Sequence, residues 1–340
     1  MQISTTLTTT PTSDERLAEI LADPGFGTHF TDHMFIVEWT PDLGWHDARI
    51  EPYGPLSLDP ATAVLHYAQE TFEGMKAYRH PDGSVWSFRP EQNGARMVRS
   101  SQRLALPELP VEDFVQAVDA LVEVDQRWVP DASAGEKSLY LRPFMIATEA
   151  FLGVRPSQHV TFMVIASPAG AYFKGGLVPH NFQISGYDRA APHGTGAAKV
   201  GGNYAASLMP GSEAKKSGFA DAIYLDPMTH SKIEEVGSAN FFGITHDNQF
   251  ITPKSPSVLP GITRLSLIEL AQTRLGLEVV EGEVFIDKLD QFKEAGACGT
   301  AAVISPIGGI QYNGKLHVFH SETEVGPVTQ KLYKELTGVQ

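Results

Sequence analysis

Strand-like and helical segments do not alternate regularly along this chain, and their order restricts the fold more than any other feature. Apolar runs rich in β-branched and aromatic residues come first, at 33–39, 63–78 and 84–90. Two helical patterns follow at 91–106 and 111–129, and then come two further strand-like runs, SLYLRPFMIAT and HVTFMVIASP. A sheet, then helices, then a sheet predicts an α+β domain and not a doubly wound one.

The chain is long enough for two domains. At 340 residues it exceeds the roughly 100–200 residues of one ordinary domain. The stretch SPAGAYFKGG interrupts two strand-like runs with a proline and several glycines, so we place an interdomain linker at residues 168–177. This divides the chain into an N-terminal domain, residues 1–167 with a flexible tail at 1–11, and a C-terminal domain, residues 178–340.

Helix signals mark several boundaries. Thr12 and Glu15 match a capping box that opens a short first helix. A later helix should begin at about Asn203, and Pro210 followed by Gly211 should kink it or end it early, because proline removes a backbone hydrogen bond. A final helix is predicted at about 324–336.

Composition and charge exclude several classes of partner. The formal net charge of −14 opposes binding to nucleic acid or to an anionic membrane surface, because both need a basic face. No apolar run reaches the roughly 20 residues that span a bilayer, and the opening segment resembles neither a signal nor a transit peptide. A single cysteine, Cys298, excludes an internal disulfide. We therefore expect a cytoplasmic protein without a nucleic-acid or membrane partner.

Lys199 is the leading candidate for chemistry. It lies among small residues in the stretch GTGAAKVGGNYAASL. A lysine amine is nucleophilic only when neutral, and burial among apolar groups lowers its pKa toward that state, so that it can form an imine with an aldehyde. The local sequence leaves open that Lys199 is a surface lysine in a glycine-rich loop. The common nucleotide-binding and zinc motifs are missing, and the scattered histidines indicate no metal site.

Seven sequence blocks occur in the order found in one enzyme family: FEGMKAYR, SLYLRPF, GAYFKGG, KVGGNYAASL, IEEVGSANFF, LPGITR and CGTAAVISP. With them the chain resembles the branched-chain amino acid aminotransferases, a fold-type IV group of pyridoxal phosphate enzymes, over nearly its whole length. The resemblance implies a two-domain fold, with a small N-terminal α/β domain and a larger C-terminal domain that binds pyridoxal 5′-phosphate, and a homodimer that completes each site. It also implies reversible amino-group exchange between L-leucine, L-isoleucine or L-valine and 2-oxoglutarate, which gives branched 2-oxo acids and L-glutamate.

The resemblance assigns cofactor-binding residues. Lys199 resembles the lysine that holds pyridoxal phosphate covalently and later moves a proton between substrate and cofactor. Glu235 resembles the carboxylate that pairs with the pyridine nitrogen, whereas its strand neighbour Glu234 should point to the opposite face and be solvated. The remaining residues would contact the ring hydroxyl or the phosphate: Arg96, Tyr204, Gly261, Ile262, Thr263 and Thr300.

The resemblance also assigns a substrate pocket. Arg142 resembles the arginine that binds the second carboxylate of glutamate, and Ser238 and Ala301 would hold the α-carboxylate. Leu152 and Val154 resemble a loop that reaches into the pocket of the partner subunit, which makes dimerisation part of the site. An aromatic lining is assigned to Phe26, Tyr67, Phe72, Tyr140 and Tyr172, each of which alone could equally be a core residue.

Two other functions stay open at this point. A D-amino acid aminotransferase or an aminodeoxychorismate lyase would share the lysine and the phosphate elements, although the SLYLRPF and GAYFKGG blocks favour the branched-chain enzymes. An inactive relative could serve as an acidic, dimeric binding protein, but the intact Lys199, Glu235 and Arg96 argue against it. Ala302 and Ser305 stand where some animal members carry a C-x-x-C pair, so we expect no thiol regulation of that kind.

Overall fold

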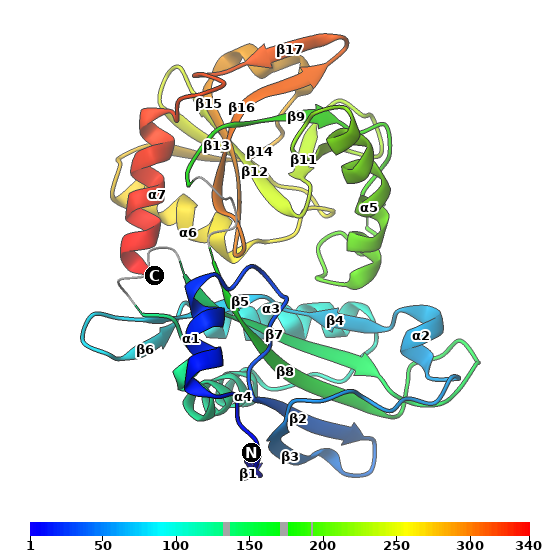
Figure 1. Ribbon diagram of the computed structural model, residues 1–340. Helices are drawn as coiled ribbons and strands as arrows, with labels where there is room; N and C mark the ends of the chain where they lie inside the picture. The colour runs from blue at the N-terminus through cyan, green and yellow to red at the C-terminus, as the bar shows by residue number, and fades with distance from the viewer. Residues whose placement is uncertain (132–136, 171–175, 192) are drawn as a thin grey trace. The chain divides into compact units, whose positions relative to one another are not determined.

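The chain divides into two compact units in a computed structural model that describes residues 1–131, 137–170, 176–191 and 193–340. The N-terminal unit holds Met1–Tyr172 together with Ala198–Gly201, and the C-terminal unit holds Phe173–Ala197 and Gly202–Gln340 (Figure 1). Lys199 therefore belongs to the N-terminal unit. Residues 171–175 of the predicted linker lie outside the described residues, and its first residues, Pro168 and Ala169, end a strand.

An eight-stranded sheet forms the N-terminal unit. Its order is β1-β3-β2-β8-β7-β5-β6, and β4 also pairs with β7. Its strands are β1 (Ser4–Thr5), β2 (His33–Thr40), β3 (Gly44–Pro52), β4 (Glu70–Phe72), β5 (Met75–Arg79), β6 (Val85–Ser87), β7 (Ser138–Ala147) and β8 (Val160–Ala169). Within the predicted flexible tail at 1–11, Ser4 and Thr5 form β1 and pair with Arg49 and Ile50 of β3.

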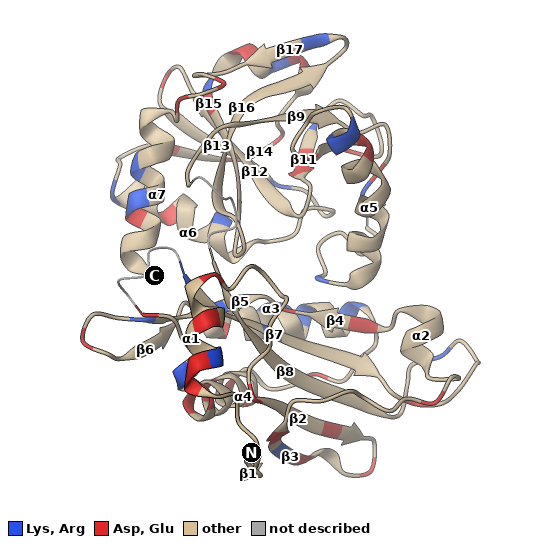
Figure 2. Cartoon of the chain, in the orientation of Figure 1, with Lys and Arg blue, Asp and Glu red and all other residues tan. Residues whose placement is uncertain are grey.

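The helices of this unit are α1 (Asp14–Ala22), α2 (Ala63–Tyr67), α3 (Pro90–Arg103) and α4 (Val111–Val124), followed by the 3₁₀ turn η1 (Gln126–Trp128). The cap of α1 is Ser13, whose hydroxyl accepts from the Arg16 N–H, and not Thr12 as predicted. Thr12 instead bonds to Asp32. The exposed side of α1 carries charges of both signs (Figure 2).

The predicted strand at 63–78 begins instead as helix α2. Ala68 adopts a left-handed backbone conformation with φ 47°, which ends that helix and lets the chain enter β4. In α4, Phe114, Val118 and Leu121 are all buried in the hydrophobic core that α4 shares with the sheet.

A closed arrangement of strands forms the core of the C-terminal unit. Its nine-stranded sheet has the order β11-β10-β9-β16-β15-β12-β13-β14, and an additional pairing of β11 with β12 closes six of these strands into a barrel. The strands are β9 (His180–Ile184), β10 (Ala222–Leu225), β11 (Ile233–Val236), β12 (Ala239–Thr245), β13 (Gln249–Pro253), β14 (Glu278–Gly282), β15 (Phe292–Gly299), β16 (Val303–Tyr312) and β17 (Lys315–Val318), the last paired with β16.

Three helices and a 3₁₀ segment accompany these strands: α5 (Gly201–Lys216), α6 (Ile262–Thr273), η3 (Ile286–Gln291) and α7 (Pro327–Val339). Of the predicted kink or early end at Pro210, the early end is wrong, because α5 continues through Pro210 and Gly211 to Lys216. Pro210 is buried, so its packing offsets the lost hydrogen bond and favours continuation over the end that local propensity predicts.

No helix in the described ranges has the length and apolar character needed to cross a membrane.

Candidate active site

Strand β4 holds the backbone of Lys199 in place. The carbonyl oxygen of Lys199 accepts a hydrogen bond from the Thr71 hydroxyl at 2.9 Å and another from the Phe72 N–H at 3.1 Å. On the other side, the Lys199 N–H donates to the Ser100 hydroxyl of α3 at 2.9 Å. The next residue but one, Gly201, donates its N–H to the Glu70 carboxylate. The lysine is thus fixed by two elements of its own unit.

The Lys199 amine lies in surroundings that favour its neutral form. Its Nζ is 4.7 Å from the centroid of the Phe72 ring. Burial, reinforced by the Arg96 guanidinium, lowers the pKa of Lys199 from 10.5 to about 8, while the Glu73 carboxylate acts in the opposite direction. The lowered pKa agrees with the expectation drawn from its small neighbours.

A buried ion pair orients Arg96. Its Nε and Nη2 donate to the two carboxylate oxygens of Glu73 at 2.8 and 2.7 Å, and the Asn93 amide donates to the same carboxylate at 2.7 Å. The Glu73 side chain is fully buried and that of Arg96 is 4% exposed. Sequence reasoning missed Glu73, although it lies in the block FEGMKAYR and a buried carboxylate needs a cation.

Arg142 lies among aromatic rings on β7. Its guanidinium carbon is 4.8 Å from the Phe72 ring centroid and 5.6 Å from that of Tyr140, whose hydroxyl accepts from Nη2 at 3.3 Å. Phe26 packs edge-on against Tyr140 at 5.0 Å. These four predicted residues therefore come together in one unit, whereas Tyr172 lies outside the described residues.

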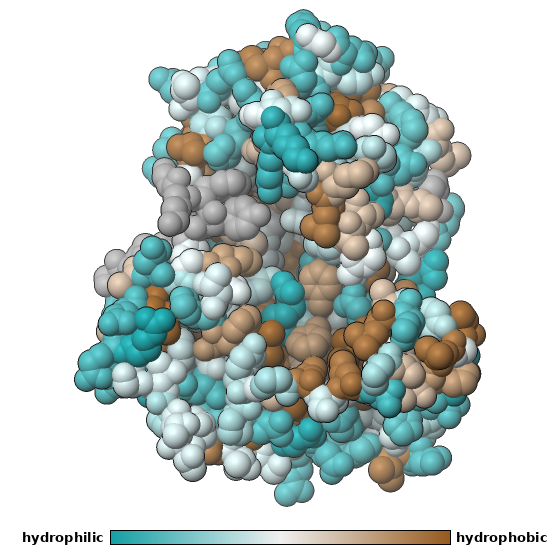
Figure 3. Space-filling model, turned by 45° about the vertical axis from the view of Figure 1, so that its right-hand side comes forward, coloured by the Kyte–Doolittle hydropathy of each residue, from teal (hydrophilic) through white to brown (hydrophobic). Residues whose placement is uncertain are grey.

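Three further residues of the predicted pocket are at the surface of the same unit. Leu152 and Val154 are 62% and 86% exposed, and Tyr67 is 42% exposed. The Tyr67 hydroxyl donates to the Leu152 carbonyl, which links α2 to this loop. Figure 3 shows hydrophobic side chains gathered on the surface of the N-terminal unit.

Glu235 is a buried carboxylate of the C-terminal unit that pairs with an arginine, Arg189. One of its oxygens lies 2.7 Å from Arg189 Nε, and the other accepts from the Leu259 N–H at 2.7 Å and from Asn240 at 3.3 Å. Arg189 was not predicted. It lies well before β11 in the sequence, and no local pattern relates it to Glu235.

The prediction that Glu234 is solvated is wrong. Glu234 is buried, and its carboxylate accepts hydrogen bonds from the hydroxyls of Ser255 and Ser257 at 2.6–2.8 Å. Alternation along a strand does place Glu234 and Glu235 on opposite faces. In this unit, however, β11 is covered on both faces, and the serine hydroxyls supply the hydrogen bonds that a buried carboxylate needs.

The block LPGITR forms the predicted turn into a helix. Gly261 is the N-cap of α6, and Ile262 and Thr263 form its buried first turn. A Cβ at Gly261 would overlap the Asn240 amide, so only glycine fits there. The free N–H groups and the dipole of this helix start favour an anion. Thr300 and Ala301 lie, half-buried, in the turn between β15 and β16.

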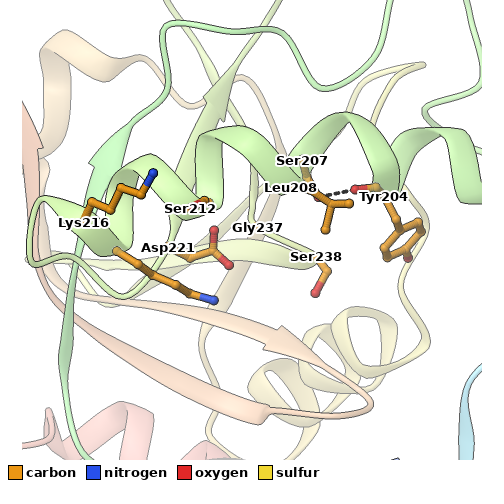
Figure 4. A pocket seen from close by; sticks show the side chains of 10 residues that line it. Tyr204, Ser207, Leu208, Ser212, Lys216, Asp221, Gly237 and Ser238 are labelled. Atoms are coloured by element: carbon orange, nitrogen blue, oxygen red, sulfur yellow. Dashed lines mark hydrogen bonds between the residues drawn. The ribbon is translucent and has the colours of Figure 1, made fainter.

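Tyr204 and Ser238 line a cavity of about 660 Å³ in the C-terminal unit. Figure 4 shows Tyr204 on α5 and Ser238 on the segment after β11, with Leu208 and Asp221 also on the cavity wall. A smaller cavity shares Tyr204 and Ser238 and reaches Glu235 and Arg189. Of the predicted residues in this unit, Tyr204 and Ser238 therefore line both cavities, and Glu235 lines the smaller one.

Among the residues that the structure describes, no group of three or more histidine, cysteine, aspartate or glutamate side chains is placed to hold a metal ion.

The model of one protein family, amino-transferase class IV, matches residues 70–310. The chain belongs to the class IV aminotransferases. This class IV aminotransferase is 56% identical over 321 residues to the branched-chain-amino-acid aminotransferase of Haemophilus influenzae, with 93% of each chain covered. It is 47% identical to that of Mycolicibacterium smegmatis, with 100% of this chain and 95% of the relative covered.

Two solved structures have the same fold as this class IV aminotransferase. The branched-chain amino acid aminotransferase from Escherichia coli matches with a TM-score of 0.71 and 26% identity, covering 90% of this chain and 93% of the other. The branched-chain amino acid aminotransferase from Thermobaculum terrenum, in its PLP-form, matches with a TM-score of 0.71 and 25% identity, covering 90% and 94%. The resemblance drawn from the seven blocks and the predicted fold-type IV class are confirmed.

Proposed function

We propose that this chain is a pyridoxal phosphate-dependent branched-chain-amino-acid aminotransferase, which exchanges the amino group of L-leucine, L-isoleucine or L-valine with 2-oxoglutarate. The relatives that carry this name cover nearly the whole chain at up to 56% identity, and their number and coverage support the proposal. The observation that carries it is the Lys199 amine, fixed by β4 beside Phe72, with a pKa of about 8.

The residues present fit the chemistry of this cofactor. When bound, pyridoxal phosphate supplies an aldehyde that condenses with amines and a protonated pyridine ring that withdraws electrons from the amino acid's α-carbon. Lys199 is the amine for the aldehyde, and Glu235 is a buried carboxylate for the ring nitrogen. Arg96 and the first turn of α6, at Gly261, Ile262 and Thr263, together with Thr300, would bind the phosphate, and Tyr204 would bind the ring hydroxyl.

Lys199 would act as the base that takes the α-proton from the substrate. It would then act as the acid that donates this proton to the cofactor. With a pKa of about 8, roughly a tenth of the amine is neutral at pH 7, compared with about one part in several thousand for an ordinary lysine. A base whose pKa is near the working pH transfers protons most efficiently in both directions. The backbone bonds from Thr71 and Phe72 leave the side chain as the moving part.

The cluster around Arg142 supports recognition of two kinds of side chain. Phe26, Phe72 and Tyr140 present apolar ring surface that suits a branched aliphatic group. The Arg142 guanidinium suits the second carboxylate of glutamate and 2-oxoglutarate. Ser238 and Ala301 would bind the α-carboxylate that all these substrates share.

We also propose a homodimer and a cytoplasmic location. Leu152 and Val154 expose apolar side chains next to Tyr67, and a second copy of the chain would remove this surface from water. The cytoplasmic proposal rests on the single cysteine, Cys298, which is buried.

The visible absorbance spectrum of the purified protein tests the proposed function. We expect a yellow protein that bleaches when L-leucine is added without an oxo acid and recovers its colour with 2-oxoglutarate. D-Alanine is the control that separates the branched-chain enzyme from a D-amino acid aminotransferase, and it should leave the colour unchanged. A yellow protein that L-leucine does not bleach would refute the substrate class. Lys199→Ala should lower turnover by a factor of about 1,000 or more.

A further inference from the structure

The carboxylate of Glu70 lies on the same face of the N-terminal sheet as the Arg142 guanidinium. In the antiparallel pairing of β4 with β7, Glu70 is opposite Ile146 and Phe72 is opposite Phe144. Alternation along each strand therefore places Glu70 and Phe72 on one face with Phe144 and Arg142. Arg142 packs on the Phe72 ring at 4.8 Å, so the acid and the arginine lie on either side of the same aromatic residue.

The Glu70 carboxylate is held in one place. It accepts a hydrogen bond from the Gly201 N–H, at the start of α5. A Cβ at Gly201 would overlap this carboxylate, so the close approach requires glycine. Glu70 is therefore a fixed charge and not a mobile surface acid.

Arg142 has a charge that its immediate neighbours do not balance. Within the described ranges, its Nε is buried without a hydrogen-bond partner, and no carboxylate lies within ion-pair distance of it. Its contacts are the Phe72 and Tyr140 rings and the Tyr140 hydroxyl. Burial raises the pKa of Glu70, and the Gly201 N–H and the Arg142 charge both oppose that rise, so the acid and the arginine interact electrostatically.

We propose that Glu70 is a specificity-determining residue that balances the charge of Arg142 and so sets the preference between substrates with one carboxylate and substrates with two. The inference rests on the proposed function. When a branched aliphatic side chain occupies the pocket, Glu70 offsets the arginine's charge. When a substrate brings a second carboxylate, that carboxylate competes with Glu70 for Arg142 and is repelled by it, so Glu70 weakens dicarboxylate binding.

Glu70→Gln separates this role from a structural one. The glutamine keeps an oxygen that can accept from the Gly201 N–H but carries no charge. The readout is the dissociation constant of the holoprotein for two unreactive acids, glutarate with two carboxylates and 4-methylpentanoate with one carboxylate and a branched chain. We expect Glu70→Gln to tighten glutarate binding about tenfold and to change 4-methylpentanoate binding less than twofold.

Two further variants decide the cause. In an Arg142→Gln background, adding Glu70→Gln should change glutarate binding less than twofold, because the partner charge is gone. Glu51→Gln is the matched control. Glu51 is a half-exposed acid on β3 that pairs with Arg49, and strands β2 and β8 lie between β3 and β7 in the sheet. It changes the net charge equally and should leave both dissociation constants unchanged.

Three results would overturn the inference. Glu70→Gln could change the binding of both acids equally, or its effect on glutarate binding could persist in the Arg142→Gln background. The wild-type protein could also fail to bind glutarate. Loss of the proposed function has a different signature. A protein that fails to transaminate L-leucine, yet shows the expected dependence of glutarate binding on Glu70 and Arg142, would refute the proposed reaction and leave the role of Glu70 intact.

Discussion

Arg189 Nε lies 2.7 Å from the Glu235 carboxylate, and the two side chains are only 9% and 4% exposed. The second carboxylate oxygen accepts from the Leu259 N–H at 2.7 Å, so each oxygen has a donor. A carboxylate held in this way is rigid. Arg189 therefore positions Glu235 for its proposed contact with the cofactor ring.

Arg189→Met should destabilise the protein strongly. It leaves the Glu235 carboxylate buried without its cation, a change that typically costs about 3–5 kcal/mol of unfolding free energy. Urea unfolding measures the cost, with the Tm as a second readout. Arg189→Lys, which keeps the charge but loses the guanidinium geometry, should cost less. A cost below about 1 kcal/mol for Arg189→Met would show that solvent or another cation balances Glu235.

The Lys199 amine should react at a lower pH than ordinary lysines. Acylating reagents attack neutral amines, so the rate of modification rises with pH and levels off above the pKa. For Lys199 in the cofactor-free protein the midpoint should fall near pH 8, whereas an unperturbed lysine has its midpoint near 10.5. Peptide mapping of the modified protein over a pH series measures this. A midpoint above pH 10 would contradict the proposed base.

Glu73→Gln should shift that midpoint and destabilise the N-terminal unit. Glu73 raises the pKa of Lys199, so removing its charge lowers the pKa and moves the midpoint to lower pH. The variant also removes the carboxylate charge that pairs with the buried Arg96, at a cost of about 3 kcal/mol. Glu91→Gln, an exposed position on the same helix as Arg96, is the control and should cost less than about 0.5 kcal/mol. A midpoint that moves to higher pH would contradict the assigned interaction.

Gly201→Ala and Gly202→Ala should have opposite effects on stability. A Cβ at residue 201 would overlap the Glu70 carboxylate, and we expect a loss of about 1–3 kcal/mol. A Cβ at residue 202 meets nothing within 4 Å, so alanine there should be neutral or stabilise by up to about 1 kcal/mol. Thermal unfolding of both variants tests the pair. Equal stabilities would show that Glu70 does not approach residue 201.

Sequence patterns located the reactive residues but not the residues that control them. Lys199 and Glu235 were found because each lies in a block with distinctive neighbours, and Arg96 was assigned from the resemblance. The pairing of Arg96 with Glu73 and of Glu235 with Arg189 has no sequence signal, because an ion pair depends on which strands and helices meet and not on local spacing.

The errors in the fold have the same origin. Strand alternation correctly separated Glu234 from Glu235, yet it could not show that β11 is covered on both faces and that serine hydroxyls would satisfy Glu234. Propensity predicted that Pro210 would end or kink a helix, yet α5 continues through it, and Pro210 is buried.

By itself, the sequence determined the family, the α+β organisation and the identity of the reactive lysine, because these depend on residue types and on spacing along the chain. Tertiary structure alone decided the environment of that lysine. Burial, the buried Glu73–Arg96 pair and the contacts from β4 bring together residues far apart in the chain, and together they set the pKa and the position of the Lys199 amine.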